Sequence, residues 1–185
     1  MAKHDVFIAH PANSWRWVED FEVDLKEKLD ALRPEGEIAV HLPRRGWSLG
    51  CTSDDTLQEA RQSVIFLAIL APSVRTSYDD RVFFREWKAF KESYDMFGPA
   101  GNRTVLVCLE DTSRQCINRY FNLAEHEDAF QISFQFHFKD DLGTTHTLAR
   151  DSHGCAYRRK IAELASYLEG RLDRIKQRVF SRDQR

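Results

Sequence analysis

Residues 63–71, SVIFLAILA, are apolar on both alternations after the opening serine. A strand with one face in water alternates apolar and polar residues, whereas a strand covered on both faces is a continuous apolar run. Pro72 closes the run, because proline lacks the N–H that a sheet ladder needs. The stretch therefore predicts the central strand of a mainly parallel sheet.

Strand and helix patterns alternate on either side of this run. Four more strands are predicted, at residues 5–9, 37–42, 103–109 and 130–138, the last half-exposed and near the sheet edge. Helices are expected at about 14–33, 54–62, 80–97 and 156–178, with Asn13 or Ser14, Ser53 or Asp54, and Ser77 with Asp80 as capping signals. Residues 43–55 and 139–154 are predicted loops. The pattern implies an α/β three-layer sandwich around a mainly parallel, five-stranded, flavodoxin-like sheet.

The length of 185 residues fits a single domain over residues 1–185. Two interpretations stay open for the basic tail at 179–185: a frayed end, or the start of a segment that continues beyond Arg185. The net charge of −2 argues against non-specific binding to nucleic acid or to an anionic membrane.

The segments at 1–10 and 64–71 bear on the cellular compartment. MAKHDVFIAH, residues 1–10, lacks the apolar centre of a signal peptide, and the longest apolar run, residues 64–71, is far shorter than the ~20 residues of a membrane span. Four cysteines without CxxC spacing read as reduced thiols. We expect a cytoplasmic protein that binds neither membrane nor nucleic acid.

Common cofactor and metal motifs are missing from the sequence. It contains no G-x-G-x-x-G, no G-x-x-x-x-G-K-[ST] and no H-E-x-x-H. His146, His153 and Cys155 match no usual zinc spacing, and Cys116 has no base that the sequence places beside it. We therefore predict no metal and no cofactor.

Ligand sites in parallel α/β folds lie at the carboxyl ends of the strands. Three segments follow predicted strands: AHPANS at 9–14, PRRGWSLG at 43–50 and APSVRTS at 71–77. In the second, Arg44 and Arg45 suit a phosphate and Trp47 suits a ring, but the pattern alone favours a solvated turn with a packed tryptophan. His10 fits a ligand contact and a local backbone contact equally well.

Glu86 is the carboxylate that could converge with these three segments on one cleft. It lies in RVFFREWKAF, residues 81–90, in the first turns of the helix after the third segment. Phe83, Trp87 and Phe90 form a helical stripe, and Glu86 is about 100° from Trp87. Either it is a surface charge that complements the helix dipole, which the pattern alone favours, or it is held at the mouth of a pocket.

Several segments, in this order, resemble a bacterial Toll/interleukin-1 receptor (TIR) domain. HDVFIAH at 4–10 is similar to the first strand of that family, and HLPRRGWSLG at 41–50 is similar to its BB loop, with Gly46 and Gly50 in the usual places. EARQSVIFLAILAPSVRTS at 59–77 resembles its helix B, central strand and next loop. FREWKAF at 84–90 matches the segment in which enzymatic TIR domains carry a catalytic glutamate, here Glu86. The first strand departs from the family by ending in Ala-His-Pro, and residues 110–155 carry little of its pattern.

The resemblance implies cleavage of NAD+ as a substrate, with Glu86 as the catalytic residue. By the same resemblance, Arg44 and Arg45 hold the pyrophosphate and Trp47 stacks on a ring. The implied substrate-binding residues are His10, Pro11, Arg44, Arg45, Gly46, Trp47, Ser73, Ser77 and Phe84. Products would be nicotinamide with ADP-ribose or a cyclic ADP-ribose-type signal. The implied setting is antiphage defence, with activation by TIR–TIR self-association and a downstream effector that senses the nucleotide product.

Two other functions stay open at this point. The chain could be a non-enzymatic TIR adaptor that binds other TIR domains through PRRGWSLG and helix faces, with Glu86 as a surface charge. It could also be an enzyme similar to nucleoside 2-deoxyribosyltransferases, which share the α/β layout and also use a glutamate.

Overall fold

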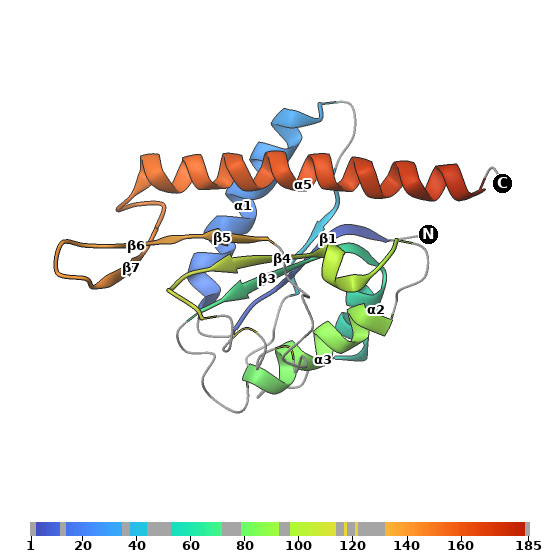
Figure 1. Ribbon diagram of the computed structural model, residues 1–185, viewed down its shortest axis with the longest axis horizontal. Helices are drawn as coiled ribbons and strands as arrows, with labels where there is room; N and C mark the ends of the chain where they lie inside the picture. Colours follow the sequence, from blue (N-terminus) through green and yellow to red (C-terminus); the bar gives the residue numbers. More distant parts are fainter. Residues whose placement is uncertain are drawn as a thin grey trace.

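A computed structural model describes residues 3–11, 14–34, 38–43, 53–71, 79–92, 97–113, 117, 121 and 132–183. Its centre is a five-stranded, all-parallel sheet in the order β2-β1-β3-β4-β5. The strands are β1 (His4–Ala9), β2 (Val40–His41), β3 (Ser63–Leu70), β4 (Thr104–Cys108) and β5 (Ser133–Gln135). The predicted fold class is confirmed (Figure 1).

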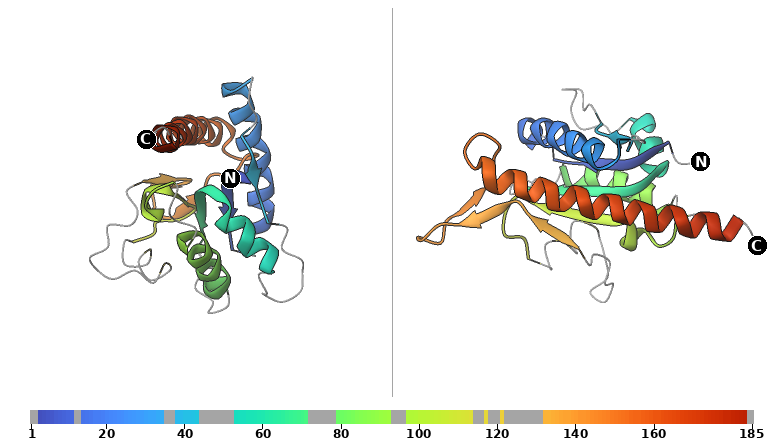
Figure 2. Two further views of the ribbon diagram at one scale, coloured as in Figure 1. Left: turned by 90° about the vertical axis from the view of Figure 1, so that its right-hand side faces the viewer. Right: turned by 90° about the horizontal axis from the view of Figure 1, so that it is seen from above.

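Helices cover both faces of this sheet (Figures 1 and 2). α1 (Trp15–Leu32) and α5 (Gly154–Asp183) pack together on one face, and α2 (Asp54–Arg61) and α3 (Asp79–Glu92) pack together on the other. A short 3₁₀ helix, η3 (Ala100–Arg103), leads into β4. The result is the three-layer arrangement that strand–helix alternation predicts.

β3 is the central strand, and all eight of its residues are buried. Ile65, Leu67 and Ile69 join the core beneath α1 and α5, while Phe66, Ala68 and Leu70 join the core beneath α2 and α3. This two-sided burial is why the sequence shows no polar alternation there. The sheet order reverses between β1 and β3, and in doubly wound sheets ligands bind beyond the carboxyl ends of the strands at this point.

Residues 130–138 were expected to form one strand, and this prediction is wrong. β5 ends at Gln135, and β6 (His137–Lys139) pairs antiparallel with β7 (Thr145–Thr147) in a separate two-stranded sheet. Phe136 lies between them: its N–H donates to the Cys108 carbonyl at 2.8 Å, and its own carbonyl accepts from the N–H of Leu148 at 2.7 Å. The chain therefore changes partners at one residue. The edge position predicted for this region holds for β5.

The prediction of a loop at residues 139–154 is also wrong in part, because β7 lies within this segment. Asp140 closes the β6–β7 turn, since its Oδ1 accepts from the N–H groups of Leu142 and Thr144. Gly143 takes a φ of 80° there, which glycine adopts without a Cβ clash.

Helix termini differ from expectation mainly at α5. This helix begins at Gly154 and continues to Asp183, so a frayed end is wrong for residues 179–183. Ser53 caps α2 as predicted, with its Oγ accepting from the N–H of Thr56 at 3.2 Å. Ser14 precedes α1 but makes no such bond; its hydroxyl donates to the Pro11 carbonyl instead. Among the described residues, no helix combines the length and apolar character needed to cross a membrane.

Candidate active site at the carboxyl edge of the sheet

Glu86 is completely buried, so the surface-charge interpretation is wrong. Burial on α3 extends beyond the predicted aromatic stripe, because two adjacent residues are buried in each turn. These residues are Val82 with Phe83, Glu86 with Trp87, and Ala89 with Phe90. Glu86 therefore lies inside the covered face of the helix. α3 begins at Asp79, which places Glu86 about 10 Å along the helix axis from its start.

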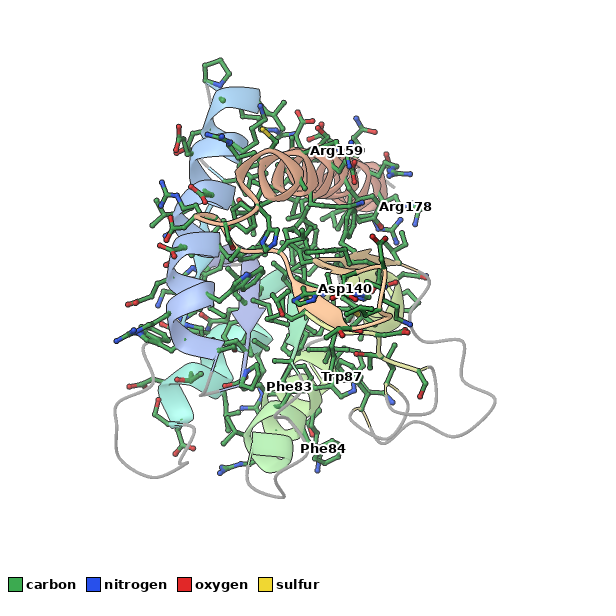
Figure 3. All side chains as sticks on the ribbon, turned by 90° about the vertical axis from the view of Figure 1, so that its left-hand side faces the viewer. Phe83, Phe84, Trp87, Asp140, Arg159 and Arg178 are labelled. Atoms are coloured by element: carbon green, nitrogen blue, oxygen red, sulfur yellow. The ribbon has the colours of Figure 1, made fainter. Side chains whose placement is uncertain are left out.

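Aromatic rings surround this part of α3. The ring of Phe66 on β3 lies 6.0 Å from that of Phe83, 5.7 Å from Trp87 and 5.2 Å from Phe90. Phe121 closes the other side, with its ring 5.2 Å from Phe83 and 5.1 Å from Trp87. In Figure 3, Phe83 and Trp87 lie between α3 and the sheet, whereas the half-buried Phe84 lies on the flank of the helix.

A buried carboxylate is costly to the fold. Moving an ionised carboxyl group out of water costs several kcal/mol unless partners compensate, and such groups concentrate at functional sites. In surroundings of low polarity, the charge of Glu86 would act more strongly on a nearby cation than it would in water. This arrangement suits the stabilisation of positive charge on a bound molecule.

A second buried charge in the same aromatic cluster shows what a structural role looks like. Arg103 is 1% exposed and donates to the carbonyls of Gly98, Ser63 and Val64. Its guanidinium also lies 4.4 Å from the centre of the Phe90 ring. Because Ser63 and Val64 begin β3, Arg103 is at the amino end of the sheet. There it joins β3 to the residues before β4.

His10 and Pro11 occupy the carboxyl end of β1, and both are buried. Nδ1 of His10 lies 3.0 Å from the Pro11 carbonyl, which only accepts, so Nδ1 carries the proton of this bond. The ring centre of His10 is 5.4 Å from that of Trp15. The structure thus shows the local backbone contact that was one of the two predictions for His10.

The structure describes four of the residues predicted for the site. His10 and Pro11 follow β1, and Phe84 and Glu86 lie on the helix after β3; the two strands are parallel neighbours, with Ala9 opposite Ala68. His10 and Pro11 therefore lie at the carboxyl edge of the sheet, and Phe84 and Glu86 lie on the helix that leaves this edge and covers one face. The other predicted site residues lie outside the described residues: Arg44, Arg45, Gly46, Trp47, Ser73 and Ser77.

Glu86 and His10 are both covered in the structure. Neither Glu86 nor His10 has any exposed surface. A molecule as large as a nucleotide can therefore reach the carboxylate only after the side chains that cover it move. Any activity of Glu86 depends on such a rearrangement.

A different set of ionisable side chains meets at the amino end of β1, and sequence reasoning missed it. His4, His41 and Glu59 each offer a ligand atom, and these atoms lie within 4.8 Å of one another. Burial lowers the pKa of His4 and of His41 below the usual value, although the Glu59 carboxylate acts in the opposite direction on both. The three residues are far apart in the sequence, so only the pairing of β1 with β2 and the return of α2 reveal them.

Comparison with known proteins gives no relative for this chain. It matches no protein-family model and no curated protein sequence. Its fold class is therefore defined by its sheet order, and its candidate site by the burial of Glu86.

Proposed function

We propose that this chain is a TIR-type enzyme that cleaves the bond between nicotinamide and ribose in NAD+, with Glu86 as its catalytic carboxylate. The observation that carries the proposal is the complete burial of Glu86 on the helix after the central strand, whose Phe83, Trp87 and Phe90 pack against other aromatic rings. The sequence resemblance to TIR domains selects the same residue. The doubly wound sheet supports the proposal, because its order puts β1 and β3 at the point where such folds bind ligands.

The chemistry of NAD+ cleavage suits a single carboxylate. Nicotinamide departs from a cationic pyridinium as a neutral ring, so no acid is needed to protonate it. The ribose carbon that it leaves becomes oxocarbenium-like and positively charged. A carboxylate held beside this carbon stabilises the developing charge, and a dry aromatic surround strengthens the effect. Water then adds to the ribose carbon and loses a proton, which gives ADP-ribose.

The remaining substrate contacts follow from the resemblance. Arg44 and Arg45 bind the pyrophosphate and Trp47 stacks on a ring, while Ser73, Ser77 and Phe84 line the site with His10 and Pro11. Because Glu86 is fully covered, the resting protein has low activity, and self-association of TIR domains opens the site. The product is ADP-ribose or a cyclic relative that a downstream effector senses in antiphage defence.

The decisive experiment incubates the full chain with NAD+, alone and under crowding or enforced clustering, and measures nicotinamide by liquid chromatography and mass spectrometry. Glu86→Gln keeps the size of the side chain and removes its charge, so nicotinamide release should fall by at least about 100-fold. Glu92→Gln is the matched control, because Glu92 lies on the same helix, is exposed and pairs with the exposed side of Arg61 at 3.1 Å. This control should remain within about twofold of the wild type.

Three results would reject the proposal. Wild-type turnover by a folded Glu86→Gln variant removes Glu86 from the mechanism. Failure of the wild type to release nicotinamide in any assembled state leaves the adaptor function. Base release from deoxynucleosides but not from NAD+ identifies a deoxyribosyltransferase.

A further inference from the structure

We propose that His4, His41 and Glu59 bind a divalent transition-metal ion of the zinc type. Within this His–His–Glu cluster, His4 lies at the opposite end of β1 from His10, about 20 Å away for six residues of extended chain, and the backbone of His41 lies opposite Phe7. The site is thus distinct from the one around Glu86, and it does not depend on the function proposed for that residue.

Three elements of regular structure fix the cluster. His4 is the first residue of β1 and His41 is the last residue of β2, and these strands are parallel neighbours with Val6 opposite Val40. Glu59 is on α2, which packs against β1. The imidazole ring centres of His4 and His41 are 4.6 Å apart. The backbone therefore places all three side chains in advance of any ligand.

The distances suit a small cation. One ligand atom from each residue lies within 4.8 Å of the other two. Zinc bonds of ~2.0–2.1 Å place tetrahedral ligand atoms about 3.4 Å apart. Small rotations of the side chains are enough to change one arrangement into the other.

The state of the ligand atoms also points to a cation. Nε2 of His41 makes a close contact with Oε2 of Glu59 at 2.5 Å, and within the described residues the buried Nε2 of His4 beside them makes no hydrogen bond. A cation between them would satisfy the lone pairs of both nitrogens and of the carboxylate. Lys3 contacts the other oxygen, Oε1 of Glu59, at 3.2 Å. It thereby orients the carboxylate without occupying the oxygen that faces His41.

The donor set selects the class of metal. Two imidazoles and one carboxylate suit zinc and its neighbours, whereas calcium and magnesium prefer oxygen ligands alone. Three protein ligands leave a position for water; the three side chains are partly exposed, although Nε2 of both histidines is itself buried, so an ion reaches these nitrogens after a small movement of the side chains. A bound ion would tie β2 to α2, the two elements on either side of the sequence segment that contains Arg44, Arg45 and Trp47.

The test titrates the full chain with Zn2+ after chelator treatment and desalting, in competition with a chromogenic zinc indicator. The wild type should bind one ion per chain. His4→Gln, His41→Gln and Glu59→Gln should each lower the affinity at least tenfold. His146→Gln is the matched control, because His146 contacts a carboxylate of its own, Asp140 at 2.8 Å, outside the cluster. Its affinity should equal that of the wild type.

Cobalt provides a readout that needs no variant. Co2+ bound to the wild type should give the intense visible absorption of a four-coordinate site, and Zn2+ should displace it. Absence of zinc binding by the wild type, equal binding by the cluster variants, or the weak spectrum of six-coordinate cobalt would each overturn the proposal. Circular dichroism of every variant separates lost binding from lost folding; should His41→Gln unfold, Glu59→Gln and the cobalt spectrum still decide.

Discussion

The two ends of β1 treat polar side chains in opposite ways. At the carboxyl end, His10 has no exposed surface, and Glu86 on the helix after the neighbouring strand is equally covered. At the amino end, His4, His41 and Glu59 are partly exposed and contact one another. Residues 6–9 of the strand between them are apolar and buried. The polar side chains near its two ends therefore suit different purposes: a fully covered charge can act on a bound molecule after a rearrangement, and a partly exposed cluster can take up an ion after smaller side-chain movements.

The two ends of β1 would not be independent if a change at one end altered function at the other. Glu86→Gln tests this, because it should change NAD+ cleavage strongly and zinc affinity not at all. The variant should lose NAD+ cleavage by at least about 100-fold while it binds Zn2+ with the affinity of the wild type. Its charge lies on α3, which supplies none of the proposed metal ligands. Parallel zinc titrations and nicotinamide assays on one preparation measure both. A loss of zinc affinity in the folded variant would show that the ends form one site.

Thiol reactivity sharpens the claim that the carboxyl edge is sealed. Cys108 ends β4 at this edge, and burial raises its pKa from 9.0 to about 11, whereas Cys155 is exposed. Since the thiolate is the reactive form, the shift alone slows Cys108 by about 100-fold near pH 8. In a Cys51→Ser, Cys116→Ser background, a disulfide reagent should modify Cys155 rapidly and Cys108 slowly. A single rate for both thiols would contradict the sealed edge; in urea, both should react alike.

The smallest expected effect is the difference in stability that results from removing a buried charge and an exposed one. Arg103→Met removes the donors to three carbonyl groups, those of the buried Ser63 and Val64 and of the half-buried Gly98, and should lower the free energy of unfolding by about 1–3 kcal/mol. Arg61→Met, which removes an exposed ion pair with Glu92, should cost about 0–1 kcal/mol. Urea unfolding monitored by circular dichroism measures both. Equal costs would mean that burial does not determine what a charge contributes in this fold.

The sequence pattern predicted a strand correctly where the whole apolar run keeps the same neighbouring strands. Residues 63–71 predicted a strand buried on both faces, and β3 is one. Residues 130–138, in contrast, alternate apolar and polar residues without a break. Such alternation shows which side of a strand is covered, but it does not show which strand is its hydrogen-bonding partner. The change of partner at Phe136 therefore left no trace in the pattern. Asp140 and Gly143 are residues typical of turns, but the polar composition of residues 139–154 predicted a loop and not the hairpin that these two residues close.

Side-chain environment was harder to predict than fold. The spacing of Phe83, Trp87 and Phe90 put Glu86 at the border of the apolar stripe. There, whether a side chain is exposed depends on which other segments of the chain pack over the helix. Phe121 supplies part of this packing, and nothing in residues 81–90 indicates its position. The His–His–Glu cluster forms only when β1 pairs with β2 and α2 packs back against β1. No spacing of residues within one segment predicts it.

The edges of the main sheet have a consequence for assembly. The edge strands β2 and β5 contain only two and three residues, so each offers few free backbone groups along its outer side. Short edge strands are a recognised protection against sheet-to-sheet joining and the aggregation that follows. Copies of this chain that meet at high local concentration are thus steered away from building a continuous sheet. Contacts between copies are therefore expected to use side-chain surfaces in place of the main sheet's edges.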